Sequence, residues 1–315
     1  MNYCQFRNDF IKRLCNKALS VWQSIVYTCG VNADNVYTDG VVTINGVAGN
    51  YKYVGGVLAP NGCIYGIPFS SSNILKIDPT TDTVTTFGNA GGGSNKYSGG
   101  VLALNGCIYG IPAGASAILK IDTATDTVTT FGDMGAQSDK YYGGVLAPNG
   151  CIYGIPASAS AILKIDPATD TVTTFGNVNG VWVGGVLAPN GCIYGMPNSA
   201  SNILKIDPTT DTVTTFGTLS SSGYYGGVLA PNGCIYGIPA GASAILKIYT
   251  ATDTVTTFGN MGGGSNKYSG GVLAPNGYIY GIPTMSSGVL KIDPGAGVNS
   301  NFANKALLSA YLNKL

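Results

Sequence analysis

The 315-residue chain contains no histidine, and only 10% of its residues are charged. The absence of imidazole excludes Ser-His-Asp and Cys-His nucleophiles, zinc sites ligated by histidine, and a histidine general base near neutral pH. Sixteen Lys and Arg residues against fifteen Asp and Glu residues leave a net charge of +1. The composition therefore predicts no affinity for nucleic acid.

Glycine and tyrosine are abundant instead, with 47 Gly and 20 Tyr residues. High glycine content and low charge could indicate disorder. The many aromatic and β-branched residues predict an ordered, β-rich protein. The length alone would suggest two domains, but an internal repeat overrules that estimate.

The repeated unit is 41 to 44 residues long and fills most of the chain. Each copy begins with a GGVL string, continues with ILKIDP or a close variant, and in the first five copies ends with DTVTTFG. Runs of Val, Ile and Thr between Pro and Gly predict four β-strands per unit, a number typical of a β-propeller blade. In the first copy these are the GGVLA segment and residues 63–67, 74–78 and 83–87. The string GGVLAPNGCIYGIP begins at Gly55 and returns nearly unchanged at Gly99, Gly143, Gly184, Gly226 and Gly270.

The sequence thus predicts an all-β fold: a six-bladed β-propeller of four-stranded antiparallel blades over residues 38–300. The sixth copy lacks DTVTTFG, and the segment Asp39-Gly-Val-Val-Thr-Ile-Asn-Gly46 matches that string loosely. We expect residues 39–46 to supply the missing outer strand, a velcro closure that leaves no open sheet edge. Residues 1–37 are predicted to form an amphipathic helix and a linker, and residues 301–315 a second short helix.

The ILKIDP…TDTVTTFG half of the unit resembles the repeats of streptogramin-lyase-like, SMP-30-type and NHL-type propellers over residues 38–296. Those families place an (I/L)-x-(R/K)-(I/V)-D-P-x-T strand and turn before a threonine-rich strand. The resemblance implies the fold. Streptogramin lyases use histidine in a metal-assisted elimination, and this chain has none. The resemblance therefore does not imply that activity here.

Sequence variation gathers in two loops of each unit, between blades and between strands two and three, and both should lie on one face. An aromatic residue precedes each GG pair, often after a lysine. We expect these side chains to ring the mouth of the central channel, where they could hold a glycan, a planar ligand or an anionic peptide. The alternative, which we favour, is that the aromatic residues pack between blades and the lysines are solvated. The residues are Tyr53, Tyr97, Tyr141, Trp182, Tyr224 and Tyr268, with Lys52, Lys96, Lys140 and Lys267.

Residues that could suggest chemistry have plainer interpretations. Five cysteines recur once per blade, too far apart to pair and without CxxC spacing, so they should be small buried apolar residues. Unpaired thiols and the absence of a signal peptide predict an intracellular, cytoplasmic protein. The Asp78…Asp82 pair and its repeats should cap turns. We predict no metal and no cofactor.

The blades are nearly interchangeable, so no asymmetric catalytic constellation is visible and we predict that the protein is not an enzyme. The prediction is a binding or scaffold protein that contacts protein partners through its variable-loop face and channel mouth. One alternative is a repeat lectin with an aromatic glycan site on each blade. Another is a lactonase- or lyase-like enzyme with a central metal. The simplest interpretation of the two terminal helices is that they pack together against the last blade. Alternatively, Phe10, Leu14 and Trp22 of the N-terminal helix dock a partner, a use we favour over membrane contact.

Overall fold

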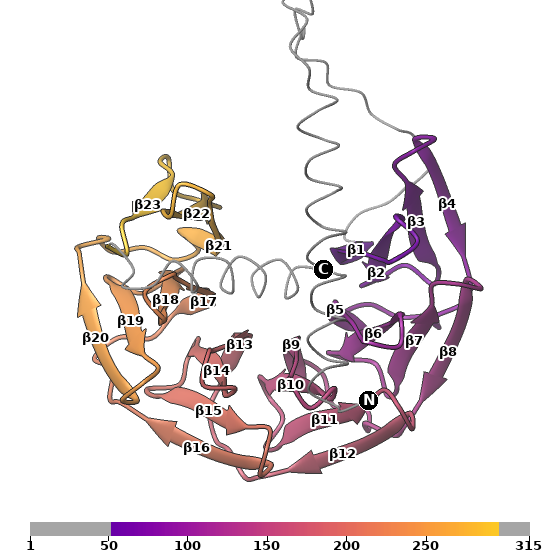
Figure 1. Ribbon diagram of the computed structural model, residues 1–315, viewed down its shortest axis with the longest axis horizontal. Coiled ribbons are helices and arrows are strands. Elements are labelled where there is room, and N and C mark those ends of the chain that lie inside the picture. Colours follow the sequence, from indigo (N-terminus) through magenta and orange to yellow (C-terminus); the bar gives the residue numbers. More distant parts are fainter. Residues whose placement is uncertain (1–51, 296–315) are drawn as a thin grey trace, which may run out of the picture. The chain divides into compact units, whose positions relative to one another are not determined.

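The computed structural model describes residues 52–295, and in this part of the chain all regular structure is β-strand (Figure 1). The first three sheets contain β1 (Tyr53–Leu58), β2 (Ile64–Pro68), β3 (Ile74–Asp78), β4 (Thr83–Phe87), β5 (Tyr97–Leu102), β6 (Cys107–Pro112), β7 (Ile118–Asp122), β8 (Thr127–Phe131), β9 (Tyr141–Leu146), β10 (Ile152–Pro156), β11 (Ile162–Asp166) and β12 (Thr171–Phe175). The last three contain β13 (Trp182–Leu187), β14 (Ile193–Pro197), β15 (Ile203–Asp207), β16 (Thr212–Phe216), β17 (Tyr224–Leu229), β18 (Cys234–Pro239), β19 (Ile245–Tyr249), β20 (Thr254–Phe258), β21 (Tyr268–Leu273), β22 (Ile279–Pro283) and β23 (Leu290–Ile292).

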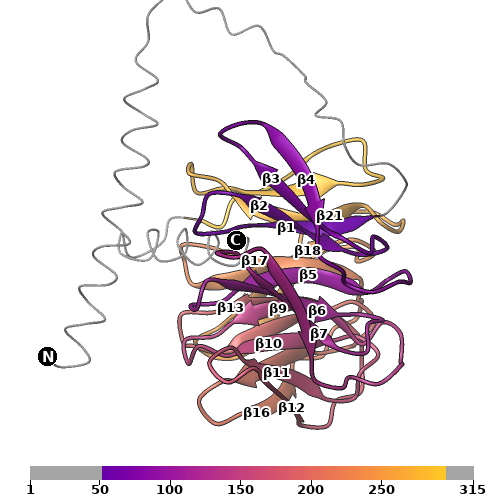
Figure 2. The same cartoon turned by 90° about the vertical axis from the view of Figure 1, so that its right-hand side faces the viewer.

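Each sheet is an antiparallel meander whose strand order follows the sequence. Five sheets have four strands, and the sixth has the three strands β21, β22 and β23. Successive sheets contact one another through their first strands: β1 with β5, β5 with β9, β9 with β13, β13 with β17 and β17 with β21. Figure 1 shows these strands innermost and the threonine-rich strands outermost, and Figure 2 shows the same blades turned by 90°. This is the predicted six-bladed β-propeller.

The predicted closing strand, residues 39–46, lies outside the described residues, as do both predicted terminal helices. Within residues 52–295 no helix is long and apolar enough to cross a membrane. The third and fourth strands of the first blade have the predicted bounds, whereas the first strand begins earlier than expected, at the aromatic residue Tyr53.

Two glycines shape each inner strand. In the second blade Tyr97 pairs with Pro112 and Gly100 with Gly110, so one extra residue forms a β-bulge between them. Gly99 within this bulge has a φ of +85°, a conformation that glycine adopts without steric cost. At Gly184 a Cβ would lie 3.2 Å from the Cα of Gly226 in the next blade. The glycine pairs therefore allow both the bulge and the close approach of neighbouring inner strands.

The hydrophobic core lies at the seams between blades, where an aliphatic side chain fills the space left by a glycine of the next blade. A Cβ on Gly100 would lie 2.5 Å from Cδ1 of Ile67, a side chain with no exposed surface. Burial of each such side chain contributes about 1.5–3 kcal/mol. The same contact returns at every later seam, as Ile111 at Gly144, Ile155 at Gly185, Met196 at Gly227 and Ile238 at Gly271. The once-per-blade cysteines are buried and free, as expected: Cys63, Cys107, Cys151, Cys192 and Cys234.

Candidate binding face

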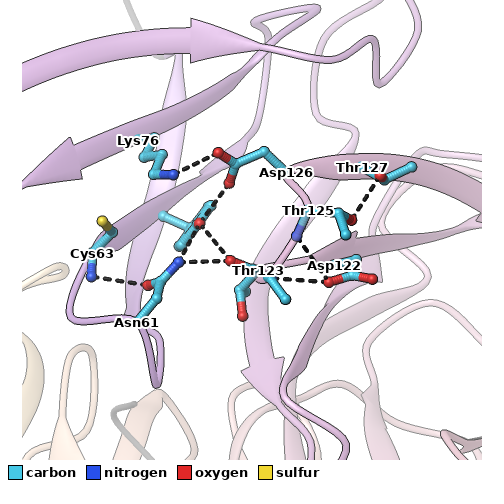
Figure 3. Close-up of polar contacts among 10 residues, drawn as sticks. Asn61, Cys63, Lys76, Asp122, Thr123, Thr125, Asp126 and Thr127 are labelled. Carbon is cyan, nitrogen blue, oxygen red and sulfur yellow. Dashed lines mark hydrogen bonds and ion pairs between the residues drawn. The ribbon is translucent and has the colours of Figure 1, made fainter.

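On the side of the propeller that carries the Pro-Asn-Gly turns, a repeated network of polar side chains joins each blade to the next (Figure 3). Asn61 donates through Nδ2 to the Tyr65 hydroxyl at 2.9 Å and to the carbonyl oxygen of Thr123, in the next blade, at 2.6 Å. The Tyr65 hydroxyl donates to Oδ1 of Asp126 at 2.7 Å, and Lys76 Nζ donates to Oδ2 at 2.5 Å. We call this set the inter-blade network. It returns at the next three seams, with Asp170, Asp211 and Asp253 as acceptors.

Electrostatics keep the network charged. The hydrogen bond to Asp126 raises the pKa of Lys76. Burial acts to raise the pKa of Asp126, but hydrogen bonds from Lys76 and Tyr65 outweigh it and the net pKa is lowered. Four lysines at this position of the blade, Lys76, Lys120, Lys164 and Lys205, therefore form inter-blade ion pairs. Asp78 behaves as predicted, because its Oδ1 accepts the backbone N–H of Thr80 at 2.9 Å and caps the turn.

On the opposite, variable side the predicted mouth lysines hold the loops together. Lys96 Nζ donates to the carbonyl oxygens of Ser71 at 2.6 Å and Gly93 at 3.3 Å, so it joins loops of two blades. Lys267 joins two loops in the same way, through the carbonyl oxygens of Gly241 and Gly264, whereas Lys140 donates to two carbonyl oxygens of its own inter-blade loop. All three lysines are buried, and burial lowers the pKa of each. Lys52 is half-buried, and its backbone carbonyl accepts the N–H of Phe69.

The predicted aromatic ring lies within the seams. The buried members are Tyr97, Tyr141, Trp182, Tyr224 and Tyr268, while Tyr53 is half-buried. Burial raises the pKa of Tyr97 and of Tyr141 to about 12. Trp182 Nε1 donates to the carbonyl oxygen of Asn202 at 2.8 Å. These side chains and the buried lysines form a rigid frame beneath the variable loops, and ligand binding by them stays a prediction.

The residue directly after each aromatic differs between blades, although the rest of the inner strand is nearly constant. It is Val54, Ser98, Tyr142, Val183, Tyr225 and Ser269 in blades one to six. Tyr225 is 41% exposed and Tyr142 is half-buried, and the Tyr225 phenol contributes a small part of the rise in the pKa of Tyr142. One position of the inner strand thus carries a tyrosine in the third and fifth blades and a smaller side chain in the other four.

A carboxylate lies beside Tyr142. Asp139 Oδ1 accepts the Tyr142 hydroxyl at 2.6 Å and Asn95 Nδ2, from the preceding inter-blade loop, at 2.6 Å. These hydrogen bonds, led by that from Tyr142, lower the pKa of Asp139. Burial, followed by the bond to Asp139, raises the pKa of Tyr142 to about 12. Asn95, Asp139, Tyr142 and Tyr225 form what we call the mouth cluster.

The mouth cluster was not predicted from the sequence, because its members come from three different repeats. Two departures from the repeat pattern could have indicated the cluster. An Asp replaces Asn before Lys140, and a Tyr follows the aromatic residue that precedes the GG pair in two copies only. Among residues 52–295 no three His, Cys, Asp or Glu side chains gather where they could hold a metal ion. Phe10, Leu14 and Trp22, predicted to dock a partner, lie outside this range.

No model of a protein family matches the sequence, and no curated protein matches it. Solved structures do. A virginiamycin B lyase from Staphylococcus aureus is similar with a TM-score of 0.63 and 14% identity, over 76% of this chain and 83% of the lyase. A streptogramin B lyase has a TM-score of 0.61 and 14% identity, over 78% and 84% of the two chains.

Hydrazine synthase of Kuenenia stuttgartiensis is also similar, with a TM-score of 0.59 and 14% identity over 87% of this chain and 86% of that one. At such identities the likeness shows the fold alone. The chain is thus a β-propeller with streptogramin-lyase-like blades, as the repeat motif predicted.

Proposed function

We propose that the protein is a non-enzymatic binding protein whose partner contacts the variable-loop face around the mouth cluster. The observation that carries this proposal is the asymmetry of that face. Every seam repeats the same frame of buried aromatic residues, and the accessible groups at the mouth differ from blade to blade. A rigid scaffold that presents varied side chains at one place is the usual design of a protein-binding surface.

The chemistry of the mouth cluster favours a protein partner. An exposed tyrosine provides a large amphipathic contact at low entropic cost, and tyrosine is enriched in protein interfaces. Asp139 adds a single negative charge that could pair with a basic side chain of the partner. The predicted docking helix with Phe10, Leu14 and Trp22 would provide a second contact.

The test is capture of binding partners by the immobilised full-length chain. Tyr225→Ala and Tyr142→Ala should remove partners that the unaltered chain retains, because each deletes an accessible aromatic contact. Leu104→Ala is the matched control, because Leu104 is 75% exposed but lies in a turn of the opposite side. Partner sets that are the same for Tyr225→Ala and the unaltered chain would refute the proposal. Comparison with a chain lacking residues 1–30 tests the helix separately.

A glycan bound at this one place is the second candidate. A sugar ring can stack on an exposed tyrosine while a carboxylate hydrogen-bonds its hydroxyl groups, and Tyr225 and Asp139 offer those two groups. The burial of five ring aromatics disfavours a separate glycan site on every blade. Binding on a glycan array that is lost in both Tyr225→Ala and Asp139→Asn would support this candidate.

A further inference from the structure

Seven Asn-Gly dipeptides lie within the described residues, and six of them occupy the same turn of the repeat. An asparagine before glycine readily loses its side-chain nitrogen as ammonia, because glycine has no side chain to shield the backbone nitrogen that attacks. The seventh asparagine, Asn179, lies in the loop between β12 and β13. The same chemistry is therefore present in two structural settings. The six turn residues are Asn61, Asn105, Asn149, Asn190, Asn232 and Asn276.

The turn of the fourth blade holds every group that deamidation would need to move. Asn190 Nδ2 donates to the Tyr194 hydroxyl at 2.9 Å and to the carbonyl oxygen of Thr250, in the next blade, at 2.8 Å. Asn190 Oδ1 accepts the N–H of Cys192 at 3.1 Å, and the N–H of Gly191 donates to a carbonyl oxygen of the turn at 3.0 Å. The turns of the first, second, third and fifth blades make the same bonds. Attack by the glycine nitrogen therefore requires several hydrogen bonds to break first.

The loop between β12 and β13 leaves its Asn-Gly pair without such bonds. On one side of the pair, Val178 is buried and its N–H donates to the carbonyl oxygen of Ser160 at 2.8 Å. On the other side, Trp182 has no exposed surface and begins β13. Asn179 itself is exposed, and among residues 52–295 neither its side chain nor the N–H of Gly180 forms a hydrogen bond. The loop is thus fixed at both ends, with an unbound dipeptide between them.

Packing requires the glycine of this pair. A Cβ on Gly180 would lie 2.7 Å from Cη2 of Trp182 and 2.9 Å from the Cβ of Ala200. A larger residue, whose side chain would shield the backbone nitrogen and slow the reaction, does not fit at this position. The fold therefore retains a reactive dipeptide in an exposed loop of the variable-loop face.

We propose that Asn179 is a site of spontaneous deamidation in the folded protein, whereas the turn asparagines of the first five blades are protected. The backbone nitrogen of Gly180 attacks Cγ of Asn179 and gives its proton to solvent, and the side-chain nitrogen takes up a proton and leaves as ammonia. Water then opens the resulting succinimide at either of its carbonyl groups. The product is aspartate or isoaspartate, and water is the only co-reactant.

The reaction changes the variable-loop face in two ways. Both products add a negative charge to the loop, and isoaspartate also adds an atom to the backbone between two anchored residues. Isoaspartate should therefore strain the contacts of Val178 and Trp182. An effect of either change on a partner rests on the proposed function, whereas the reaction itself does not.

Incubation of the full-length protein in water labelled with heavy oxygen tests the proposal, because each deamidated residue takes up a labelled oxygen that peptide mass spectrometry locates. The tryptic peptide from Ile165 to Lys205 contains both Asn179 and Asn190, so the two sites are compared under identical conditions. We expect label to enter at Asn179 at least about tenfold faster than at Asn190, since the turn must open first. Asn179→Gln is the matched control, and it should abolish the fast labelling and leave Asn190 unchanged.

Unfolding in urea separates the effect of the fold from that of the dipeptide. In the unfolded chain the two sites should react at rates within about twofold of each other, because each is then an unprotected Asn-Gly pair. Equal rates at the two sites in the folded protein would overturn the proposal. So would the absence of label at Asn179 over a period in which both sites of the unfolded chain react. Capture of partners by Asn179→Asp tests the proposed function separately.

Discussion

Substitution of Gly144 by alanine is the sharpest test of how the blades are held together. Gly144 lies at the seam between the second and third blades, and its backbone does not require glycine. A Cβ there would lie 2.6 Å from Cδ1 and 2.9 Å from Cγ1 of Ile111, and 3.3 Å from Cγ2 of Val101. Ile111 has no exposed surface, so it has little room to move.

The magnitude follows from two opposing effects. Overpacking in a filled core costs about 1–3 kcal/mol. The reduced entropy of the unfolded chain returns about 0.4–1 kcal/mol. We therefore expect Gly144→Ala to lose about 1–2 kcal/mol, which lowers the Tm of a chain of this size by roughly 2–4 °C.

Calorimetry with a compensating substitution identifies the cause of this loss. Ile111→Val removes the Cδ1 atom and by itself costs about 0.5–1.5 kcal/mol. Combined with Gly144→Ala it should cost about 1 kcal/mol less than the sum of the two. Gly92→Ala is the control, because a Cβ on Gly92 meets nothing within 4 Å. Strictly additive losses, or a neutral Gly144→Ala, would refute the interlocking of aliphatic side chain and glycine.

Three further outcomes follow from the structure. Leu104→Pro should stabilise the protein by about 0.4–1 kcal/mol in urea unfolding, since the other five such turns have proline there and Leu104 is exposed. Hydrogen bonds from Lys164 and Tyr153 outweigh burial and lower the pKa of Asp211 in the folded protein. The resulting stability is present above the pKa of an unfolded aspartate, about 3.9, and is lost as pH falls through the lower folded value. Asp211→Asn should therefore flatten the fall in Tm between about pH 5 and pH 3. Burial raises the pKa of Cys151, so its labelling by a thiol reagent should be slow until the protein is unfolded in denaturant.

The repeat made much of the architecture predictable. The GGVL, CIYGIP, ILKID and TVTTF segments each form a strand, because alternating apolar residues and Pro or Gly punctuation are local signals. The start of the inner strand was predicted too late. Tyr97 pairs with Pro112 across a bulge, and an extra residue in one strand depends on the partner strand rather than on the local sequence.

The contacts between blades were less accessible to prediction from the sequence. Lys76 and Asp126 are 50 residues apart, and each is typical of a solvated turn or edge when considered within its own repeat. Their ion pair depends on how one sheet is placed against the next. The mouth cluster has the same origin, because Asn95 and Asp139 meet only when two inter-blade loops lie side by side. Repetition predicts what each blade contains, and the side chains shared between blades require the assembled structure.

The inter-blade network is directional, and this has a consequence for association. One blade provides Asn, Tyr and Lys, and the next provides Asp and a carbonyl oxygen, so the interface between blades is heterologous. A row of blades joined in this way must either close into a ring or continue into another chain. The last blade still holds the donor set Asn276, Tyr280 and Lys291, and Asp82 of the first blade forms no ion pair among the described residues. If the donor set of the last blade, Asp82 of the first blade and the β23 edge were all unoccupied, two chains could join through them as two neighbouring blades do. A net charge of +1 would give little electrostatic repulsion against this association. A strand that covers the β23 edge would therefore protect the protein against end-to-end association as well as stabilise its last blade.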